Sequence, residues 1–334
     1  MADRPLVLVT HQADESVRRA YSDVLAESAQ VCFLGDLGES TRDVVNKATV
    51  FSALFPDREL ATVSEAISDR LELLQLITSG ANHVDLARWP KDVLIATSPG
   101  AQSPEIAEHA LALMLAGAKN LFDRHVKLKR GEFDQFSNNR LLAGAICGII
   151  GFGGIGKATA RLCRAFGMEI HALNRSGTTD ESVEFVGTLE DLPRVLAGAD
   201  FVVLSIELTT RTANLIGASE LALMKPDAVL VNVARAGLVS EDALYRHLRE
   251  HPSFVACVDA WWKEPSTHGS FSTDLPLLEL PNLIGSPHNA SRVPGITAKM
   301  SLHAALNIYQ FLVNGLPDHV VDPREKPIPP GSRH

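Results

Sequence analysis

The chain has 334 residues, with 31 Lys and Arg against 40 Asp and Glu, which gives a formal net charge of −9 and a pI near 5.7. At about 150 residues per domain this length predicts two domains, and a hydrophobic share of 46% excludes a mostly disordered chain. The acidic balance disfavours nucleic acid as the main partner, and the sequence contains no run of about 18 apolar residues that could cross a membrane.

The cysteines and the N-terminal residues indicate the cellular compartment. Four cysteines, Cys32, Cys147, Cys163 and Cys257, lie far apart without a CxxC pair, and three of them fall in apolar, strand-like runs. This usage predicts buried, reduced thiols. Residues 5–9 are too short for the apolar core of a signal peptide, and no small-residue cleavage site follows them. We therefore expect a cytoplasmic protein.

The first hundred residues alternate short apolar runs with amphipathic stretches. The apolar runs predict buried strands at 6–9, 31–34, 50–53, 74–77 and 93–96. The amphipathic stretches between them predict helices at 15–26 and 63–70. Ser103 followed by Pro104 is typical of a helix start and predicts a long helix there. The polar, charged segment 119–140 predicts an arm or loop.

A second alternating series begins at residue 146. Strands are predicted at 146–150, 169–173, 201–205, 229–232, 254–258 and 283–284. Helices are predicted at 155–166, 190–196, 219–224, 240–251 and 295–315, and the Pro-rich tail from residue 322 is expected on the surface. Strands regularly separated by helices predict an α/β protein with mostly parallel sheets.

A glycine-rich motif follows the first strand of this second series. It has the form GxGxxG and comprises Gly151, Gly153, Gly154, Ile155 and Gly156. The motif leaves an apolar strand and opens a helix whose apolar residues fall on one face: Ile155, Leu162, Cys163 and Phe166. The first glycine permits a tight turn, the second lets a pyrophosphate approach the backbone, and the third packs helix on strand. A purely structural turn is the alternative, but this context favours dinucleotide binding.

The next strand ends without the acid that NAD-binding proteins place near the ribose 2′-hydroxyl. Asn174 stands there, followed by Arg175 and Ser176. A carboxylate would repel a 2′-phosphate, whereas Asn174 does not, Arg175 can pair with the phosphate or stack on adenine, and Ser176 adds a hydroxyl. We predict a preference for NADP(H). The alternative is a relaxed site that uses NAD(H) and leaves Arg175 facing solvent.

Three polar residues follow the ends of three predicted strands. Arg235, Glu264 and His288 each come shortly after the last residue of such a strand. Each alone is typical of an ordinary surface residue. Because open α/β sheets place their chemistry just beyond the strand C-termini, the recurrence predicts one site facing the nucleotide.

These motifs resemble those of the D-isomer-specific 2-hydroxyacid dehydrogenase family over essentially the whole chain. The matching segments are SGANHVD at 79–85, PEIAE at 104–108, GFGGIG at 151–156, NVARAG at 232–237, DAWWKEP at 259–265 and SPHNA at 286–290. The resemblance implies two Rossmann-like or flavodoxin-like domains with parallel sheets. It implies a dinucleotide-binding domain at 100–293, inserted into a substrate domain made of 1–99 and 294–334, with the active site in the cleft between them. It also implies a homodimer formed through the 119–140 arm.

The resemblance assigns a catalytic role to each of the three polar residues. Reduction of a 2-oxo acid adds hydride to C2 while the carbonyl oxygen takes a proton. His288 can supply that proton, and a nearby Glu264 would favour the protonated imidazole. Arg235, always charged and fork-shaped, can hold the substrate carboxylate and polarise the carbonyl. Arg235 and His288 would thus contact both substrate and cofactor.

The resemblance also implies supporting contacts. Backbone N–H groups around Ser79, Gly80 and Ala81 resemble the family's cradle for the substrate carboxylate. Further cofactor contacts are implied for Thr212, Val233, Ala234, Asp259 and Ser291. Among these, Asp259 would orient the nicotinamide carboxamide.

The sequence departs from the family pattern at positions that affect pocket shape. Glu207 replaces a usual proline, Trp261 and Trp262 are unusual, and 266–278 replaces a shorter segment. Glutamate rather than glutamine at position 264 disfavours a formate dehydrogenase. The lack of an appended C-terminal regulatory domain in this sequence disfavours a serine-pathway phosphoglycerate dehydrogenase.

One metal-site motif has a simpler explanation. His247 and His251 match the HxxEH pattern of some zinc peptidases, but they end a predicted helix just before Pro252 and have no evident third ligand. Histidines there are explained by the helix C-terminal dipole, so we predict no metal.

The sequence therefore predicts an NADPH-preferring reductase of small 2-oxo acids that are glyoxylate- or hydroxypyruvate-like. Two alternatives stay open. One is a dinucleotide-sensing, corepressor-like binding protein that keeps the same three residues. The other is an NAD-dependent 2-hydroxyacid dehydrogenase.

Overall fold

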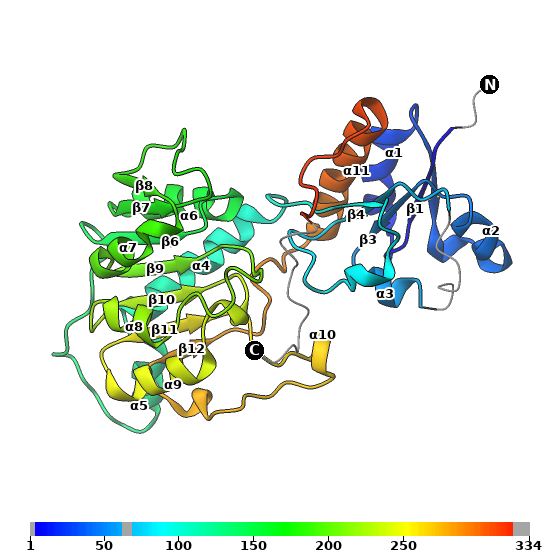
Figure 1. Cartoon of the computed structure of the whole chain (residues 1–334). Helices are drawn as coiled ribbons and strands as arrows, with labels where there is room; N and C mark the ends of the chain where they lie inside the picture. The colour runs from blue at the N-terminus through cyan, green and yellow to red at the C-terminus, as the bar shows by residue number, and fades with distance from the viewer. Residues whose placement is uncertain (1–3, 62–68, 323–334) are drawn as a thin grey trace. The chain divides into compact units, whose positions relative to one another are not determined.

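The computed structural model of the chain describes residues 4–61 and 69–322. Most of the helix predicted at 63–70, and the tail beyond residue 322, lie outside the described residues. The chain divides into two compact units, one drawn from Met1–Gln102 and Val293–Ser332 and the other from Ser103–Arg292 (Figure 1). From the sequence, these divisions were expected at 99/100 and 293/294. Among the described residues, no helix is both long and apolar enough to span a bilayer.

The first unit is built on a five-stranded parallel sheet of order β2-β1-β3-β4-β5. Its strands are β1 (Leu6–Val9), β2 (Gln30–Phe33), β3 (Val50–Ala53), β4 (Leu73–Leu76) and β5 (Leu94–Ala96). Its α-helices are α1 (Glu15–Leu25), α2 (Thr41–Val45), α3 (Pro56–Glu59) and α11 (Ile296–Asn314). This strand order is that of flavodoxin-like folds.

Helix α11 comes from the far end of the sequence yet completes the first unit. It lies beside α1 in Figure 1. Its residues Ala305, Ile308 and Phe311 share one buried cluster with Val7 and Val9 of β1. The N-terminal sheet therefore depends on a C-terminal helix for part of its core.

The second unit is built on a seven-stranded parallel sheet of order β12-β11-β10-β9-β6-β7-β8. Its strands are β6 (Ile146–Ile150), β7 (Glu169–Leu173), β8 (Phe185–Gly187), β9 (Phe201–Leu204), β10 (Val229–Asn232), β11 (Val255–Val258) and β12 (Leu283–Gly285). Its α-helices are α4 (Ser103–Ala118), α5 (Leu121–Lys129), α6 (Gly154–Ala165), α7 (Leu192–Gly198), α8 (Ala218–Leu223), α9 (Glu241–Glu250) and α10 (Pro265–His268). The order reverses between β6 and β9, which is where doubly wound sheets bind nucleotides.

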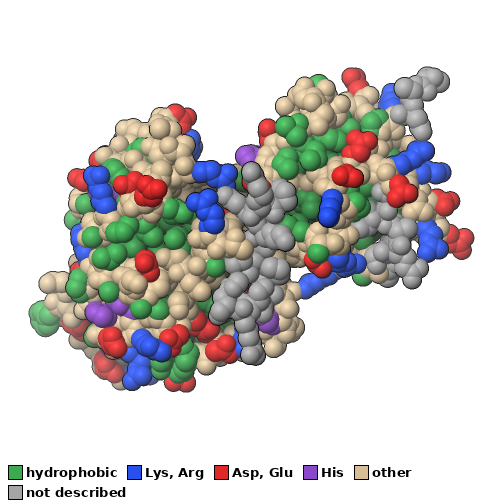
Figure 2. Space-filling model, viewed as in Figure 1, with side chains coloured by type: hydrophobic (Ala, Val, Ile, Leu, Met, Phe, Trp, Pro, Cys, Tyr) green, Lys and Arg blue, Asp and Glu red, His purple; other side chains and the backbone are tan. Residues whose placement is uncertain are grey.

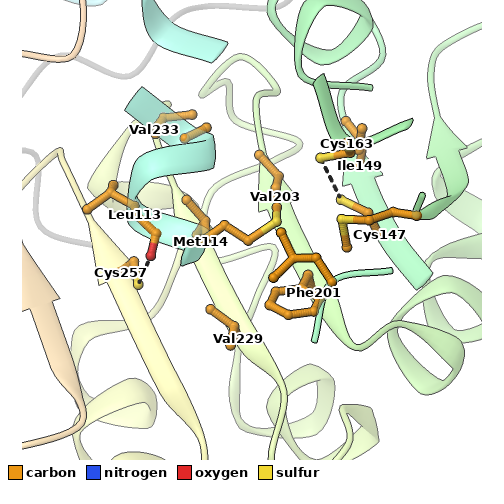
Figure 3. Close-up of a cluster of buried hydrophobic side chains, with 14 of the residues drawn as sticks. Leu113, Met114, Cys147, Ile149, Cys163, Phe201, Val203, Val229, Val233 and Cys257 are labelled. Carbon is orange, nitrogen blue, oxygen red and sulfur yellow. Dashed lines mark hydrogen bonds between the residues drawn. The ribbon is translucent and has the colours of Figure 1, made fainter. Parts of the chain in front are cut away.

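The core of the second unit explains why its strands are apolar runs. A parallel sheet covered by helices is buried on both faces. Figure 3 shows one such cluster, in which the Sγ atoms of Cys147 and Cys163 lie 3.9 Å apart and both thiols are free. Helix α4 approaches the strands closely at Gly117, where a Cβ atom would lie 3.0 Å from Val229 Cγ1. The expected α/β class with parallel sheets is confirmed.

Several local predictions were wrong. The first half of 119–140 is the helix α5 rather than a loop, and this helix buries none of its residues. The segment that contains it is rich in polar and charged residues, which is why an arm or loop was predicted. Strand β8 was missed because three residues give no recognisable period. Phe166, expected on the buried face of α6, is 43% exposed, while Thr159 and Cys163 are buried there.

The surface carries charges of both signs. On the face drawn in Figure 2, acidic and basic side chains are interspersed rather than gathered by sign.

Candidate active site

The glycine motif forms the turn between β6 and α6. Gly151 has φ +101°, and a Cβ atom there would lie 2.5 Å from the backbone nitrogen of Ile206. A Cβ atom on Gly156 would overlap the carbonyl of Gly151, so both positions require glycine. Gly153 is different, because a Cβ atom there would meet nothing within 4 Å. Ser205, just after β9, donates from Oγ to the Gly151 carbonyl over 2.8 Å, a support that was not predicted from the sequence.

The start of α6 fits a pyrophosphate. Gly153 and Gly154 are exposed, and no side chain caps the first turn of the helix within the described residues. The first N–H groups of a helix need a partner, and an anion is a suitable one. Ile155 packs against the core of the unit and fixes the helix to the sheet. The open space at Gly153 is what a phosphate needs to reach the backbone.

The turn after β7 carries the residues predicted to contact the adenosine ribose. The Asn174 side chain is engaged within that turn, where its Nδ2 donates to the Thr178 carbonyl and its Oδ1 accepts from Gly177 N, each over 2.7 Å. Arg175 and Ser176 lie exposed on the same turn. Asn174 therefore shapes the turn, on which the predicted ribose-contacting residues Arg175 and Ser176 are exposed.

His288 and Glu264 form a direct pair. The Nδ1 of His288 lies 2.8 Å from both carboxylate oxygens of Glu264, and the backbone N–H of Trp261 donates to Oε1 over 2.9 Å. Burial raises the pKa of Glu264, but the hydrogen bond and charge of His288, the Trp261 N–H and the charge of Arg235 together bring that pKa below its usual value. Glu264 is therefore an ionised carboxylate that holds one edge of the imidazole.

Arg235 lies within the electrostatic reach of this pair. Burial lowers the pKa of its guanidinium, and the charges of Glu264 and Glu207 act in the opposite direction. Arginine stays charged under such conditions. Its Nη1 donates to the Ala234 carbonyl over 2.8 Å, which directs the side chain back along the loop. The predicted trio is thus brought together within the second unit.

The turn that carries Arg235 is held by a residue that was not predicted from the sequence. Asn232, the last residue of β10, donates from Nδ2 to the Arg235 carbonyl over 2.9 Å and accepts from Ala234 N over 3.1 Å. A buried asparagine at a strand end, three residues before an arginine, was the available signal. Val233 and Ala234, predicted to line the cofactor, are buried in this turn.

His288 sits in a strained backbone conformation. Its φ is +51°, in the left-handed region that non-glycine residues rarely adopt. Asp259, just after β11 and 1% exposed, accepts from Asn289 N over 3.2 Å and from Ala290 N over 3.1 Å. The Trp261 indole N–H donates to the Ser286 carbonyl over 2.8 Å. These contacts fix the loop on both sides of the histidine.

The carboxylate oxygens of Asp259 bind the loop that carries His288. Its contact with the nicotinamide carboxamide, implied by the resemblance, stays a prediction. Thr212 likewise serves its own loop, since its hydroxyl accepts from Thr209 N over 2.8 Å and donates to the Glu207 carbonyl over 2.6 Å. Ser291 is half-buried in the turn that follows Ala290.

The predicted carboxylate cradle lies in the first unit, just after β4. Ala81 is buried, and Thr78 donates from Oγ1 to the Gly80 carbonyl over 2.9 Å. The Ser79 hydroxyl is buried and has no hydrogen-bond partner among residues 4–61 and 69–322. A buried polar atom without a partner is a candidate ligand contact.

The HxxEH motif forms an aromatic stack instead of a ligand pair. The rings of His247 and His251 stack with centroids 4.1 Å apart, and Phe254 packs against His247 edge-on. Burial, together with the neighbouring His251, lowers the pKa of His247 to about 4. Across the described ranges, no group of three His, Cys, Asp or Glu side chains is placed to hold a metal ion.

Comparison with known proteins identifies the family. Residues 111–290 match the family model described as D-isomer specific 2-hydroxyacid dehydrogenase, NAD binding domain. The chain is 32% identical to D-3-phosphoglycerate dehydrogenase of Methanocaldococcus jannaschii over 86% of its own length and 51% of that protein. It is 30% identical to glyoxylate reductase of Thermococcus onnurineus over 96% of both chains.

A solved structure shows the same relationship. The glycerate dehydrogenase related protein of Thermoplasma acidophilum is 30% identical, with a TM-score of 0.62 over 91% of this chain and 99% of that one. The chain spans about half the length of the D-3-phosphoglycerate dehydrogenases that it matches, at 51% and 53%. The resemblance inferred from the motifs is thereby confirmed, and the chain belongs to the D-isomer-specific 2-hydroxyacid dehydrogenase family.

Proposed function

We propose that this protein is a cytoplasmic, NADPH-preferring reductase that converts small 2-oxo acids of the glyoxylate or hydroxypyruvate kind into D-2-hydroxy acids. The observation that carries the proposal is the contact between His288 Nδ1 and the Glu264 carboxylate, with Arg235 beside it. Two relatives bear names of this class, a glyoxylate reductase at 30% identity and a hydroxypyruvate reductase of Thermotoga maritima at 31%.

The histidine and the glutamate form the proton-donating part of the site. Glu264 binds Nδ1, so Nε2, on the opposite edge of the ring, is the nitrogen that gives its proton to the carbonyl oxygen. The neutral ring that results remains hydrogen-bonded to Glu264, which keeps it in place to be protonated again. In the reverse direction the same Nε2 accepts the proton of the 2-hydroxy acid.

The arginine binds and polarises the substrate. The planar guanidinium of Arg235 can hold a carboxylate through two parallel hydrogen bonds while its charge stabilises the oxyanion that develops at C2. In the first unit, taken by itself, the N–H groups at Ser79, Gly80 and Ala81, and the Ser79 hydroxyl that has no partner among the described residues, suit a carboxylate. A bound nicotinamide cofactor supplies or accepts the hydride.

The cofactor preference rests on the turn after β7. NAD-binding proteins carry an acid at position 174, and its carboxylate would repel a 2′-phosphate. This chain has Asn174 there, whose side-chain amide is hydrogen-bonded within the turn, and the exposed side chains beside it are Arg175 and Ser176. An arginine can form charge-assisted hydrogen bonds with a phosphate. These features favour NADP(H) over NAD(H).

The assembly that we propose is a homodimer formed through α5 and the segment after it. This region exposes large apolar side chains, with Phe133 77% and Phe136 86% exposed, and Leu121, Phe122 and Leu128 each more than half exposed. Large exposed apolar patches mark interaction sites on soluble proteins.

The experiment is steady-state oxidation of NADPH and of NADH with a panel of 2-oxo acids. A saturable rate with at least one acid, and a higher kcat/KM with NADPH, are the expected results. A saturable rate with NADH alone would instead identify an NAD-dependent dehydrogenase. Tight cofactor binding without turnover of any acid would identify a dinucleotide-sensing protein.

A further inference from the structure

Besides the His288–Glu264 pair, a series of hydrogen-bonded side chains, His109, Ser286 and Asp259, contacts the loop that carries His288. His109, in α4, places its Nε2 2.9 Å from Ser286 Oγ, and Ser286 Oγ donates to Asp259 Oδ1 over 2.6 Å. The same imidazole nitrogen lies 3.5 Å from Asp259 Oδ1. The proposed proton and hydride transfers do not involve His109, so its place in this series needs another explanation.

The chemistry of the three groups fixes the direction of the hydrogen bonds. Asp259 accepts hydrogen bonds from Ser286 Oγ, Asn289 N and Ala290 N, so it acts as a carboxylate and donates nothing. Since the Ser286 hydroxyl proton points at Asp259, its oxygen is left to accept. His109 is therefore the donor, with its N–H on Nε2.

Helix α4 is a rigid support for this donor. The Cys257 thiol of β11 contacts the Leu113 carbonyl of α4 over 3.4 Å, and Gly117 lets the helix lie directly on the strands. These are the strands whose ends carry Arg235 and Asp259. A side chain presented by a close-packed helix holds its position better than one on a loop.

The effect of the series reaches the catalytic histidine through Asp259. The Asp259 carboxylate binds the two amides that follow His288, and His288 occupies a left-handed conformation that must be maintained by its surroundings. We propose that His109 is a positioning residue: its Nε2–H, acting through Ser286, holds Asp259 in the rotamer that fixes the loop carrying His288. This inference rests on the proposed function.

A matched pair of substitutions tests the proposal. His109→Gln keeps an N–H donor at a similar reach, whereas His109→Met keeps the length and helix propensity but removes the donor. For His109→Met we expect kcat for 2-oxo acid reduction to fall about 10- to 100-fold, with little change in KM for the acid. His109→Gln should recover most of kcat. Ala112→Met, an exposed substitution one turn further along α4, serves as the control for the helix.

A second measurement does not depend on activity. Amide hydrogen exchange at Asn289 and Ala290 reports the two hydrogen bonds to Asp259 directly. We expect exchange about five- to tenfold faster in His109→Met than in the wild type, and near the wild-type rate in His109→Gln. If the wild type reduces no 2-oxo acid, the proposed function fails while exchange at these amides still tests the positioning series.

The outcomes that overturn the proposal are specific. Equal kcat in the Met and Gln variants, or unchanged exchange at both amides in His109→Met, would show that His109 does not position the loop. Should His109→Met fail to fold, Ser286→Ala interrupts the same series from the loop, and Ser286→Thr restores the hydroxyl. The proposal then requires a lower kcat in the alanine variant and its recovery in the threonine variant.

Discussion

The Nδ1 atom of His288 lies 2.8 Å from both carboxylate oxygens of Glu264. A two-oxygen contact of this kind fixes the tilt of the ring as well as its position. Because the contact occupies one nitrogen, the proton transfer that we propose is left to the other.

Replacement of His288 by asparagine should separate chemistry from binding. Asparagine tolerates the left-handed backbone at this position, so the loop should survive the change. We expect kcat to fall by about 10²- to 10⁴-fold, the usual contribution of a general acid, while the Kd for NADPH changes little. Stopped-flow assays and fluorescence titration measure the two quantities. An unchanged kcat would remove His288 from the mechanism.

Alanine substitutions at two glycines of the same motif should affect different properties, cofactor binding at Gly153 and stability at Gly156. Gly153→Ala meets open space, so its Tm should match the wild type, but the new methyl group should weaken NADPH binding by tenfold or more, about 1.4 kcal/mol. Gly156→Ala overlaps the Gly151 carbonyl and should lower the free energy of unfolding by about 1–3 kcal/mol. Thermal melts with and without NADPH compare the pair. A Gly153→Ala variant with normal affinity would place the pyrophosphate elsewhere.

Substitution of Arg175 by alanine should shift the cofactor preference. Hydrogen bonds to charged groups contribute about 1.5–3 kcal/mol, so the ratio of kcat/KM for NADPH to that for NADH should fall by about 10- to 100-fold. The change should act mainly through KM for NADPH. Arg246→Ala, an exposed arginine on α9, provides the control. If Arg175→Ala leaves the ratio unaltered, this side chain does not select NADP(H).

The apolar side chains after α5 should control assembly. Phe133→Ser combined with Phe136→Ser removes two highly exposed rings without touching a buried residue. We expect a shift from dimer to monomer in size-exclusion chromatography with light scattering. Leu223→Ser, an exposed apolar position on α8, should leave the dimer intact. A wild-type protein that is monomeric at micromolar concentration would contradict the proposed assembly.

The buried histidine of α9 should destabilise the protein in mild acid. In the folded state the pKa of His247 is about 4, below its usual 6.5, so the unfolded chain takes up this proton first as the pH falls. Stability is therefore lost between about pH 6.5 and pH 4, and the loss from this group reaches up to about 3 kcal/mol. Above that window the imidazole is neutral in both states and costs nothing.

His247→Gln tests whether this histidine causes the loss of stability at low pH. Urea unfolding at pH 8, pH 5.5 and pH 4.5 should give a flatter dependence on pH for the variant than for the wild type. The measurement at pH 8 is the internal control for lost packing. Parallel pH profiles for the two proteins would show that His247 does not carry the effect.

The sequence allowed the fold to be predicted where the physical signal is local. The buried strands of both sheets are continuous apolar runs, and the glycines at 151 and 156 announce a turn that accepts no side chain. The predicted trio followed from the same logic, since parallel strands end at a common edge. Each of these features can be recognised from a short stretch of sequence, because the strand, the turn or the polar residue after the strand is marked by its immediate neighbours.

The parts that escaped prediction depend on distant partners. His109 and Ser286 are separated by 177 residues, and neither belongs to a pattern that would connect them. The hydrogen bonds of Asp259 to the amides of Asn289 and Ala290, about thirty residues further on, could likewise not be predicted from a local pattern. Helix α5 was missed because the segment around it is rich in polar and charged residues, which indicated an arm or loop.

The divided first unit has a consequence for biosynthesis. Since the buried residues of α11 complete the core around β1, the first unit cannot finish folding until the whole second unit and then α11 have left the ribosome. The contiguous second unit faces no such delay and can close as soon as β12 leaves the exit tunnel. Loss of α11 through premature termination should therefore spare the dinucleotide fold and leave the five-stranded sheet of the first unit exposed to chaperones and proteases.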